Sequence, residues 1–76
     1  MVRFFFDVAF DGVLTADDTG LDFARDEAAQ REALKALTEM ATEFAGSAGM
    51  REMAVMVRDE SGARLCTVTL ALSVTD

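Results

Sequence analysis

The stretch that decides the fold is VRFFFDVAF at residues 2–10, followed by DG at 11–12 and VLTA at 13–16. Even-numbered positions of the first segment are all apolar, whereas both of its charges, Arg3 and Asp7, lie at odd positions. This two-residue period is typical of a half-buried strand. Asp11-Gly12 predicts a two-residue hairpin turn, because both central residues of a type I′ turn need a positive φ. Residues 13–16 then return as a second strand, with Phe10 facing Val13.

Residues 26–45 have the spacing of an amphipathic helix. One apolar stripe runs along this segment and consists of Ala29, Ala33, Leu37, Met40 and Phe44, widened by Leu34 and Ala41. Such a stripe is the face that a helix packs against a core. Asp26 and Glu27 suit the positive N-terminal end of the helix, and Gly46 suits the position just after its last residue. Residues 46–49 are interpreted as a flexible link.

Two further strands are predicted at residues 50–58 and 63–75, joined by a type I turn from Asp59 to Gly62. A four-residue loop would pair Arg58 with Ala63, and it would place Val55 opposite Cys66 and Met53 opposite Val68. A three-residue loop would place the same residues of the first strand opposite threonines. Because a one-residue slip moves a whole apolar set to the wrong face, the four-residue loop is favoured.

The order of elements predicts an α+β fold with a ββαββ arrangement, as one domain over residues 1–76. Four mainly antiparallel strands would form a single sheet with one helix packed on one face; residues 17–20 are interpreted as a turn and 21–25 as a connector. The first and fourth strands are the longest, so we expect them near the centre. One helix leaves the other sheet face uncovered. The apolar residues expected on that face are Phe5, Ala9, Leu14, Leu65 and Ala71.

The composition excludes several classes of function. The chain has 76 residues, a net charge of −7, one cysteine and no histidine. The charge disfavours nucleic acids and anionic membranes, and zinc or copper binding without histidine is not expected. A lone cysteine fits a reducing compartment, so we expect a cytoplasmic protein. Asp7 and Asp11 interrupt the apolar start, and no signal peptide is expected. A core this small is usually reinforced by disulfides, a bound metal or oligomerisation, and of these only oligomerisation is left open.

The residues suited to chemistry are few. Cys66 lies on the apolar side of its strand with no histidine to activate it, and no serine has a base partner beyond the single lysine, Lys35. We therefore expect no enzyme activity, no catalytic residue and no cofactor. Four carboxylates lie close in sequence: Asp11, Asp17, Asp18 and Asp22. Their spacing lacks the pattern of a calcium loop, and no metal ligands are assigned, although a ligand or divalent-metal site around Asp17 and Asp18 is the alternative.

Several motifs resemble a family of short, largely alphaproteobacterial proteins classed as a domain of unknown function. They are the opening Met1-x-Arg3-Phe4-Phe5-Phe6-Asp7, the Asp11-Gly12 hairpin, Asp18-x-Gly20, Gly20-x-Asp22-Phe23-x-x-x-Glu27-Ala28-Ala29-x-x-Glu32-Ala33-Leu34, and Val57-Arg58-Asp59-Glu60-Ser61-Gly62. The family usually has a Pro-Asp pair before the helix, where this chain has Ala24-Arg25. Arginine cannot accept a hydrogen bond from the first helical N–H groups, so Asp22 or Asp26 is expected to cap the helix.

The resemblance implies a ββαββ-type domain in a bacterial cytoplasm and no assigned activity. Together with the residues, it favours a noncatalytic protein-interaction or regulatory module that forms a homodimer or binds an unknown protein partner. The uncovered sheet face is the expected interaction face, because exposed apolar patches often mark contacts. The open alternative is a solvated face with scattered apolar residues.

Overall fold

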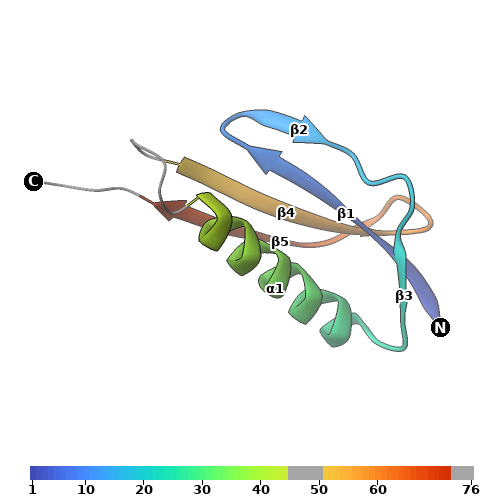
Figure 1. Ribbon diagram of the computed structural model, residues 1–76. Helices are drawn as coiled ribbons and strands as arrows, with labels where there is room; N and C mark the ends of the chain where they lie inside the picture. Colours follow the sequence, from blue (N-terminus) through green and yellow to red (C-terminus); the bar gives the residue numbers. More distant parts are fainter. Residues whose placement is uncertain (45–50, 73–76) are drawn as a thin grey trace, which may run out of the picture.

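The computed structural model describes residues 1–44 and 51–72, and this part of the chain forms one sheet and one helix (Figure 1). The elements are β1 (Val2–Phe10), β2 (Val13–Thr15), β3 (Leu21–Phe23), α1 (Asp26–Phe44), β4 (Arg51–Asp59) and β5 (Arg64–Leu72). The α+β class is confirmed. The predictions for Gly46, for the link at 46–49 and for a last strand continuing beyond Leu72 lie outside the described residues.

The first hairpin forms as its sequence predicts. Phe10 pairs with Val13, Ala9 with Leu14 and Val8 with Thr15. Asp11 and Gly12 have φ values of 48° and 86°, which are the positive angles that this turn needs. Asp11 also binds β4, since its backbone N–H donates to the carbonyl oxygen of Glu52 at 2.9 Å and its Oδ1 accepts from the Glu52 N–H at 3.1 Å.

The sheet has five strands, so the prediction of four is wrong. The extra strand is β3, in the segment interpreted as a connector. Its ends pair with β1, with Val2 opposite Phe23 and Phe4 opposite Leu21. Thus β2 and β3 share one edge of β1, at opposite ends of that strand. Three residues are too few to show a strand period in the sequence, and β3 is recognisable only by the strand with which it pairs.

The central strands are β1 and β4, in the order β2-β1-β4-β5. The expectation that the last strand lies near the centre is therefore wrong, because β5 is at the edge. Sequence alternation could not decide this point, since a central and an edge strand both turn alternate residues toward the helix. Burial separates them: Met53, Val55 and Val57 of β4 are at most 2% exposed, whereas the corresponding residues of β5 are only partly buried.

The hairpin between β4 and β5 corrects the predicted register. Gly62 N–H donates to the Asp59 carbonyl at 3.0 Å, and Asp59 N–H donates to the Ala63 carbonyl at 3.0 Å, so the loop has three residues. The register shifts between Val57 and Arg58: Arg58 pairs with Arg64 and Val57 with Cys66. This bulge accommodates one extra residue, Leu65, and keeps the apolar side of β5 on the helix side. Val55 consequently lies opposite Val68 rather than Cys66.

The helix packs on one side of the sheet, over β4 and β5 (Figure 1). The fully buried core contains Phe4, Ala29, Ala33, Leu37, Met53, Val55 and Val57. Ala29 and Ala33 are 0% exposed, and their small side chains let the helix axis approach the sheet closely. Met40 and Ala41 pack against this core as predicted, but Leu34 is 50% exposed and lies outside it.

The helix begins without a side-chain cap of the usual kind. The carbonyl oxygen of Arg25 accepts from the N–H groups of Ala28 and Ala29, at 3.2 and 3.4 Å, so Arg25 occupies the N-cap position. Asp22 is not the cap, because both of its carboxylate oxygens bind Arg3. Asp26 lies one residue inside the helix, where its charge suits the positive helix end.

A serine at position 25 should stabilise the fold. Arg25→Ser supplies a hydroxyl oxygen that can accept from an N–H of the first turn, whereas Arg25→Ala supplies none and removes the same charge. We expect the serine variant to exceed the alanine variant by about 1 kcal/mol in free energy of unfolding. Urea unfolding of the pair measures this difference, and equal stabilities would contradict the N-cap assignment.

Glycine is required at position 20 for two reasons. Gly20 has a φ of +76°, and a Cβ there would lie 2.9 Å from Arg3 Cγ and 2.9 Å from the Phe4 carbonyl oxygen. We expect Gly20→Ala to cost about 2–5 kcal/mol. Gly12→Ala is the matched control, because Gly12 has a φ of +86° with no atom within 4 Å of the added Cβ; it should cost only about 1–2 kcal/mol. Equal losses in urea unfolding would show that close packing at Gly20 is unimportant.

Candidate interaction surface

The sheet face opposite the helix divides into two parts. Toward β3 it carries charged side chains, which we call the charged network: Arg3, Asp7, Asp17, Asp22 and Arg58. Toward the β1–β2 turn it carries small and apolar side chains, which we call the apolar half: Ala9, Leu14, Ala54, Thr69 and Ala71. All of these except Leu14 line a hollow. The two parts differ in how many of their polar side chains already have hydrogen-bond partners within the protein.

Arg58 links three segments of the charged network. Its Nε donates to Asp7 Oδ2 at 2.9 Å, and its Nη2 donates to the Asp17 carbonyl oxygen at 2.8 Å. The Asp7 side chain is only 14% exposed. The Arg58 guanidinium also lies 4.5 Å from the centre of the Phe5 ring, a favourable cation–π geometry. Phe5, expected as an apolar residue of the interaction face, thus lies against a cation.

The Asp17 carboxylate holds the loop between β2 and β3 against β1. Its Oδ2 accepts from Phe6 N–H at 3.1 Å, and its Oδ1 accepts from Thr19 N–H and Gly20 N–H at 3.0 and 3.2 Å. Asp17 N–H in turn donates to Asp7 Oδ1 at 2.8 Å. The turn predicted from Asp17, Asp18 and Gly20 therefore owes its shape to one side chain that satisfies three backbone donors.

The pKa values of two of these carboxyl groups reflect their partners. Burial raises the pKa of Asp7, but hydrogen bonds from Arg58 and Asp17 outweigh it and bring that pKa below its ordinary value. For Asp17 burial likewise raises the pKa, and the three backbone N–H donors with the nearby Arg58 charge lower it further than burial raises it. Both groups are thus held as carboxylates by donors already in place.

These bonds also use the oxygens that a cation would need. The Asp17 carboxylate accepts hydrogen bonds from three backbone N–H groups, and both oxygens of Asp22 accept from Arg3, at 3.0 and 3.2 Å. Asp18 accepts from the hydroxyl of its neighbour, Thr19. Within residues 1–44 and 51–72, no group of three or more His, Cys, Asp or Glu is arranged to hold a metal ion.

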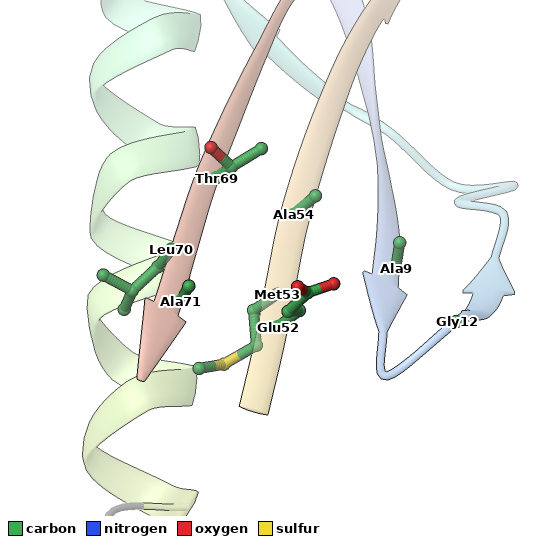
Figure 2. A pocket seen from close by; sticks show the side chains of 8 residues that line it. All are labelled: Ala9, Gly12, Glu52, Met53, Ala54, Thr69, Leu70 and Ala71. Atoms are coloured by element: carbon green, nitrogen blue, oxygen red, sulfur yellow. The ribbon is translucent and has the colours of Figure 1, made fainter. Parts of the chain in front are cut away.

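The apolar half surrounds a hollow of about 400 Å³ (Figure 2). Ala9 of β1 pairs with Leu14 on one side and with Ala54 on the other, and Ala71 of β5 pairs with Glu52. Figure 2 shows Ala9, Ala54 and Thr69 on the side of the sheet away from the helix, whereas Leu70 points toward the helix. The structure thus brings together Ala9, Leu14 and Ala71 from the predicted face.

The sequence interpretation missed three residues of this region, Glu52, Ala54 and Thr69. They line the hollow with Ala9 and Ala71. Only the pairing of β4 between β1 and β5 reveals them, because they are distant from Ala9 in the sequence. Leu65, the remaining predicted residue, lies at the bulge near the opposite end of β5 and is 37% exposed.

Cys66 lies on the helix side of β5, opposite Val57, and packs against the core. Burial raises the pKa of its thiol. A raised pKa keeps the sulfur protonated at neutral pH, and the protonated form is a poor nucleophile. The position of Cys66 therefore suits a small apolar side chain.

Comparison with known proteins identifies the family. Residues 3–71 match the family described as Domain of unknown function (DUF6894). The chain belongs to this family. No curated protein and no solved structure matches the chain. Within the described residues, no helix is both long and apolar enough to cross a membrane.

Removing the Asp17 charge should lower the free energy of unfolding at pH 7 and make that free energy depend less on pH under acidic conditions. The pKa values of Asp7 and Asp17 are lower in the folded protein than in the unfolded chain, so both carboxylates stabilise the folded state. This contribution is complete above the pKa values of the unfolded chain and is lost as the pH falls through those of the folded protein, so unfolding becomes easier below about pH 5. We expect Asp17→Asn to cost about 1–3 kcal/mol at pH 7. Its stability should also fall less steeply between pH 5 and 3.

Asp18→Asn is the matched control for this prediction. Asp18 is exposed and its Oδ1 accepts from the Thr19 hydroxyl, so its change should stay within about 0.5 kcal/mol. Urea unfolding at several pH values measures both variants. Equal losses for the two aspartates, or an unchanged acid slope in Asp17→Asn, would contradict the role given to Asp17.

Proposed function

We propose that this protein is a noncatalytic protein-interaction module of the bacterial cytoplasm, which binds a protein partner through the apolar half of its bare sheet face and also self-associates. The observation that carries the proposal is the division of that face. The charged network is saturated by its own hydrogen bonds, whereas the apolar half presents Leu14, 62% exposed, beside a hollow.

Two features support the noncatalytic part of the proposal. The sequence contains no histidine, so the commonest general base is missing. Its one thiol, Cys66, packs against the core and has a raised pKa. The alternative of a metal or ligand site at the acidic turn has less support, because Asp17 already accepts three backbone N–H groups.

A regulatory role is consistent with the same geometry. An apolar patch beside charged groups that are already paired can be covered by a partner without breaking those ion pairs. Interfaces commonly combine such an apolar centre with a polar rim. Glu52 at the border of the hollow is a polar group of this rim, and it would favour a partner that carries a hydrogen-bond donor or a cation there.

The partner contact can be tested by placing a charge on either side of the same strand. Leu14→Arg puts a cation on the bare face, whereas Val13→Arg, at a position 67% exposed, puts it on the other face of β2. We expect tagged wild-type protein and Val13→Arg to retain a stoichiometric protein partner from native lysate. Leu14→Arg should retain at least tenfold less.

The comparison is informative only for folded variants, so circular dichroism and urea unfolding accompany it. Both substitutions lie at exposed positions of a three-residue edge strand, so both should fold. Loss of the partner in both variants, or its retention in both, would count against the bare face as the contact.

A further inference from the structure

Among the described residues, β5 is the long strand at the edge of the sheet. In the part of the chain that the structure describes, β5 pairs with β4 along one side only. From Leu65 to Leu72 it contains no charged residue, no proline and no glycine. Proteins usually protect a strand edge with charges, proline or bulges, because its free N–H and C=O groups accept a further strand. The bulge and the one charge of β5, Arg64, both lie at its first residues, and the rest of the edge carries none of these devices.

The opposite edge of the sheet is different. There β1 is flanked by β2 and β3, which have three residues each and are separated by the loop that Asp17 holds. Edge strands this short offer little length for pairing. The two edges are therefore not equivalent, and β5, with nine residues, is the one able to accept a strand.

The burial of the helix-side residues reflects the edge position of β5 within the described part of the sheet. Val55 and Val57 of β4 are 0% exposed, with a strand on each side. The helix-side residues of β5 are only partly buried: Cys66, Val68, Leu70 and Leu72. A further strand beside β5, carrying apolar residues on the same face, would complete their burial.

Leu34 marks the same edge from the helix. The crossover from β3 through α1 to β4 joins parallel strands on either side of β1, and such crossovers are right-handed in nearly all proteins. Successive residues of a helix are rotated by about 100° around its axis. In a right-handed crossover, Leu34 therefore lies on the helix flank nearer β5, whereas Leu37 faces the sheet. Leu34 is 50% exposed, so the helix flank above the free edge presents an apolar side chain as well.

We propose that β5 pairs in an antiparallel manner with β5 of a second copy, around a two-fold axis that is perpendicular to the sheet and passes midway between the two Val68 residues. This inference rests on the proposed self-association and names its contact. Full overlap of residues 64–72 places Val68 opposite Val68 of the second copy and Thr67 opposite Thr69. The same axis keeps the helix-side residues of both copies on one face, so the two apolar layers become continuous.

The two helices fit this arrangement. Each helix lies over β4 and β5, so the two helix axes are separated by about two strand spacings, roughly 10 Å. Packed helices lie about 8–10 Å apart. The flanks that carry Leu34 then face each other, and the helices bury the apolar surface that a monomer leaves open.

The charges do not oppose this contact. Each copy carries a net charge of −7, which repels a second copy at long range. At the shared edge, however, the only charged residue of β5 is Arg64, and full overlap places it opposite Leu72. The two arginines are then roughly 26 Å apart, so no like charges meet along the paired strands.

Sedimentation equilibrium between 1 and 200 µM tests the dimer directly. The wild type is expected at twice the mass of the chain, 8.2 kDa. Thr67→Lys/Thr69→Lys places lysines opposite each other on exposed positions of β5, and Leu34→Glu charges the helix flank; each should weaken the dimer at least tenfold. Thr15→Lys and Leu14→Glu make the same changes on β2, at the opposite edge, and should leave the dimer unchanged.

The register is tested by mixed disulfide formation. In a Cys66→Ala background, Thr67→Cys and Thr69→Cys proteins are mixed in equal amounts and oxidised. Paired residues of neighbouring antiparallel strands lie within disulfide reach, so the mixed disulfide should exceed either homodimer at least fivefold.

Three results would overturn the proposal. They are a monomer throughout this concentration range, a dimer that neither the β5 variant nor the Leu34 variant weakens, and equal amounts of the mixed disulfide and the two homodimers. These results are separable from the partner contact. Leu14→Arg tests partner capture and lies away from β5. A monomeric wild type whose partner capture still depends on Leu14 would sink only the β5 inference. A dimer that responds to the β5 and Leu34 variants, with capture that does not depend on Leu14, would sink only the partner contact.

Discussion

The carboxylate of Asp17 is the constraint on which much of this small sheet depends. It satisfies three backbone N–H groups, two in its own loop and one on β1, and thereby fixes the path from β2 to β3. Gly20 follows with a positive φ, packed against the backbone of β1. Because that path is fixed, β3 pairs with the start of β1, and the chain reaches the correct end of the sheet to begin the helix.

Arg58 extends this constraint to β4. Its guanidinium joins Asp7 on β1, the Asp17 carbonyl in the loop and the ring of Phe5. These groups lie on the face without the helix, where a charge network can remain partly hydrated. The face consequently has two characters: one region whose polar groups are mutually satisfied, and another that is small, apolar and hollowed. A contact with another protein costs less desolvation in the second region.

One helix over five strands leaves more surface to cover than the chain supplies. The helix buries β4 fully on its side but only partly buries β5, whose outer edge carries no neighbour among the described residues. A chain of this size buries a small core, and association is the usual remedy when disulfides and metals are not used. The edge and the bare face share β5, but strand pairing uses the backbone groups of the edge whereas the apolar half presents side chains, so a dimer contact and a partner contact need not compete.

The sequence by itself determined the local structure. The alternation from Val2 to Phe10, the Asp11-Gly12 turn and the stripe through Ala29, Ala33 and Leu37 predict their elements, because each signal lies within a short, continuous segment. Only the tertiary structure decided what lies beside what. The strand β3, the bulge at Leu65 and the edge position of β5 depend on pairing between distant segments. The interaction face shares this limit: Ala9 and Leu14 were predictable as hairpin neighbours, whereas Ala54 and Thr69 join them only through the strand order, which no local pattern encodes.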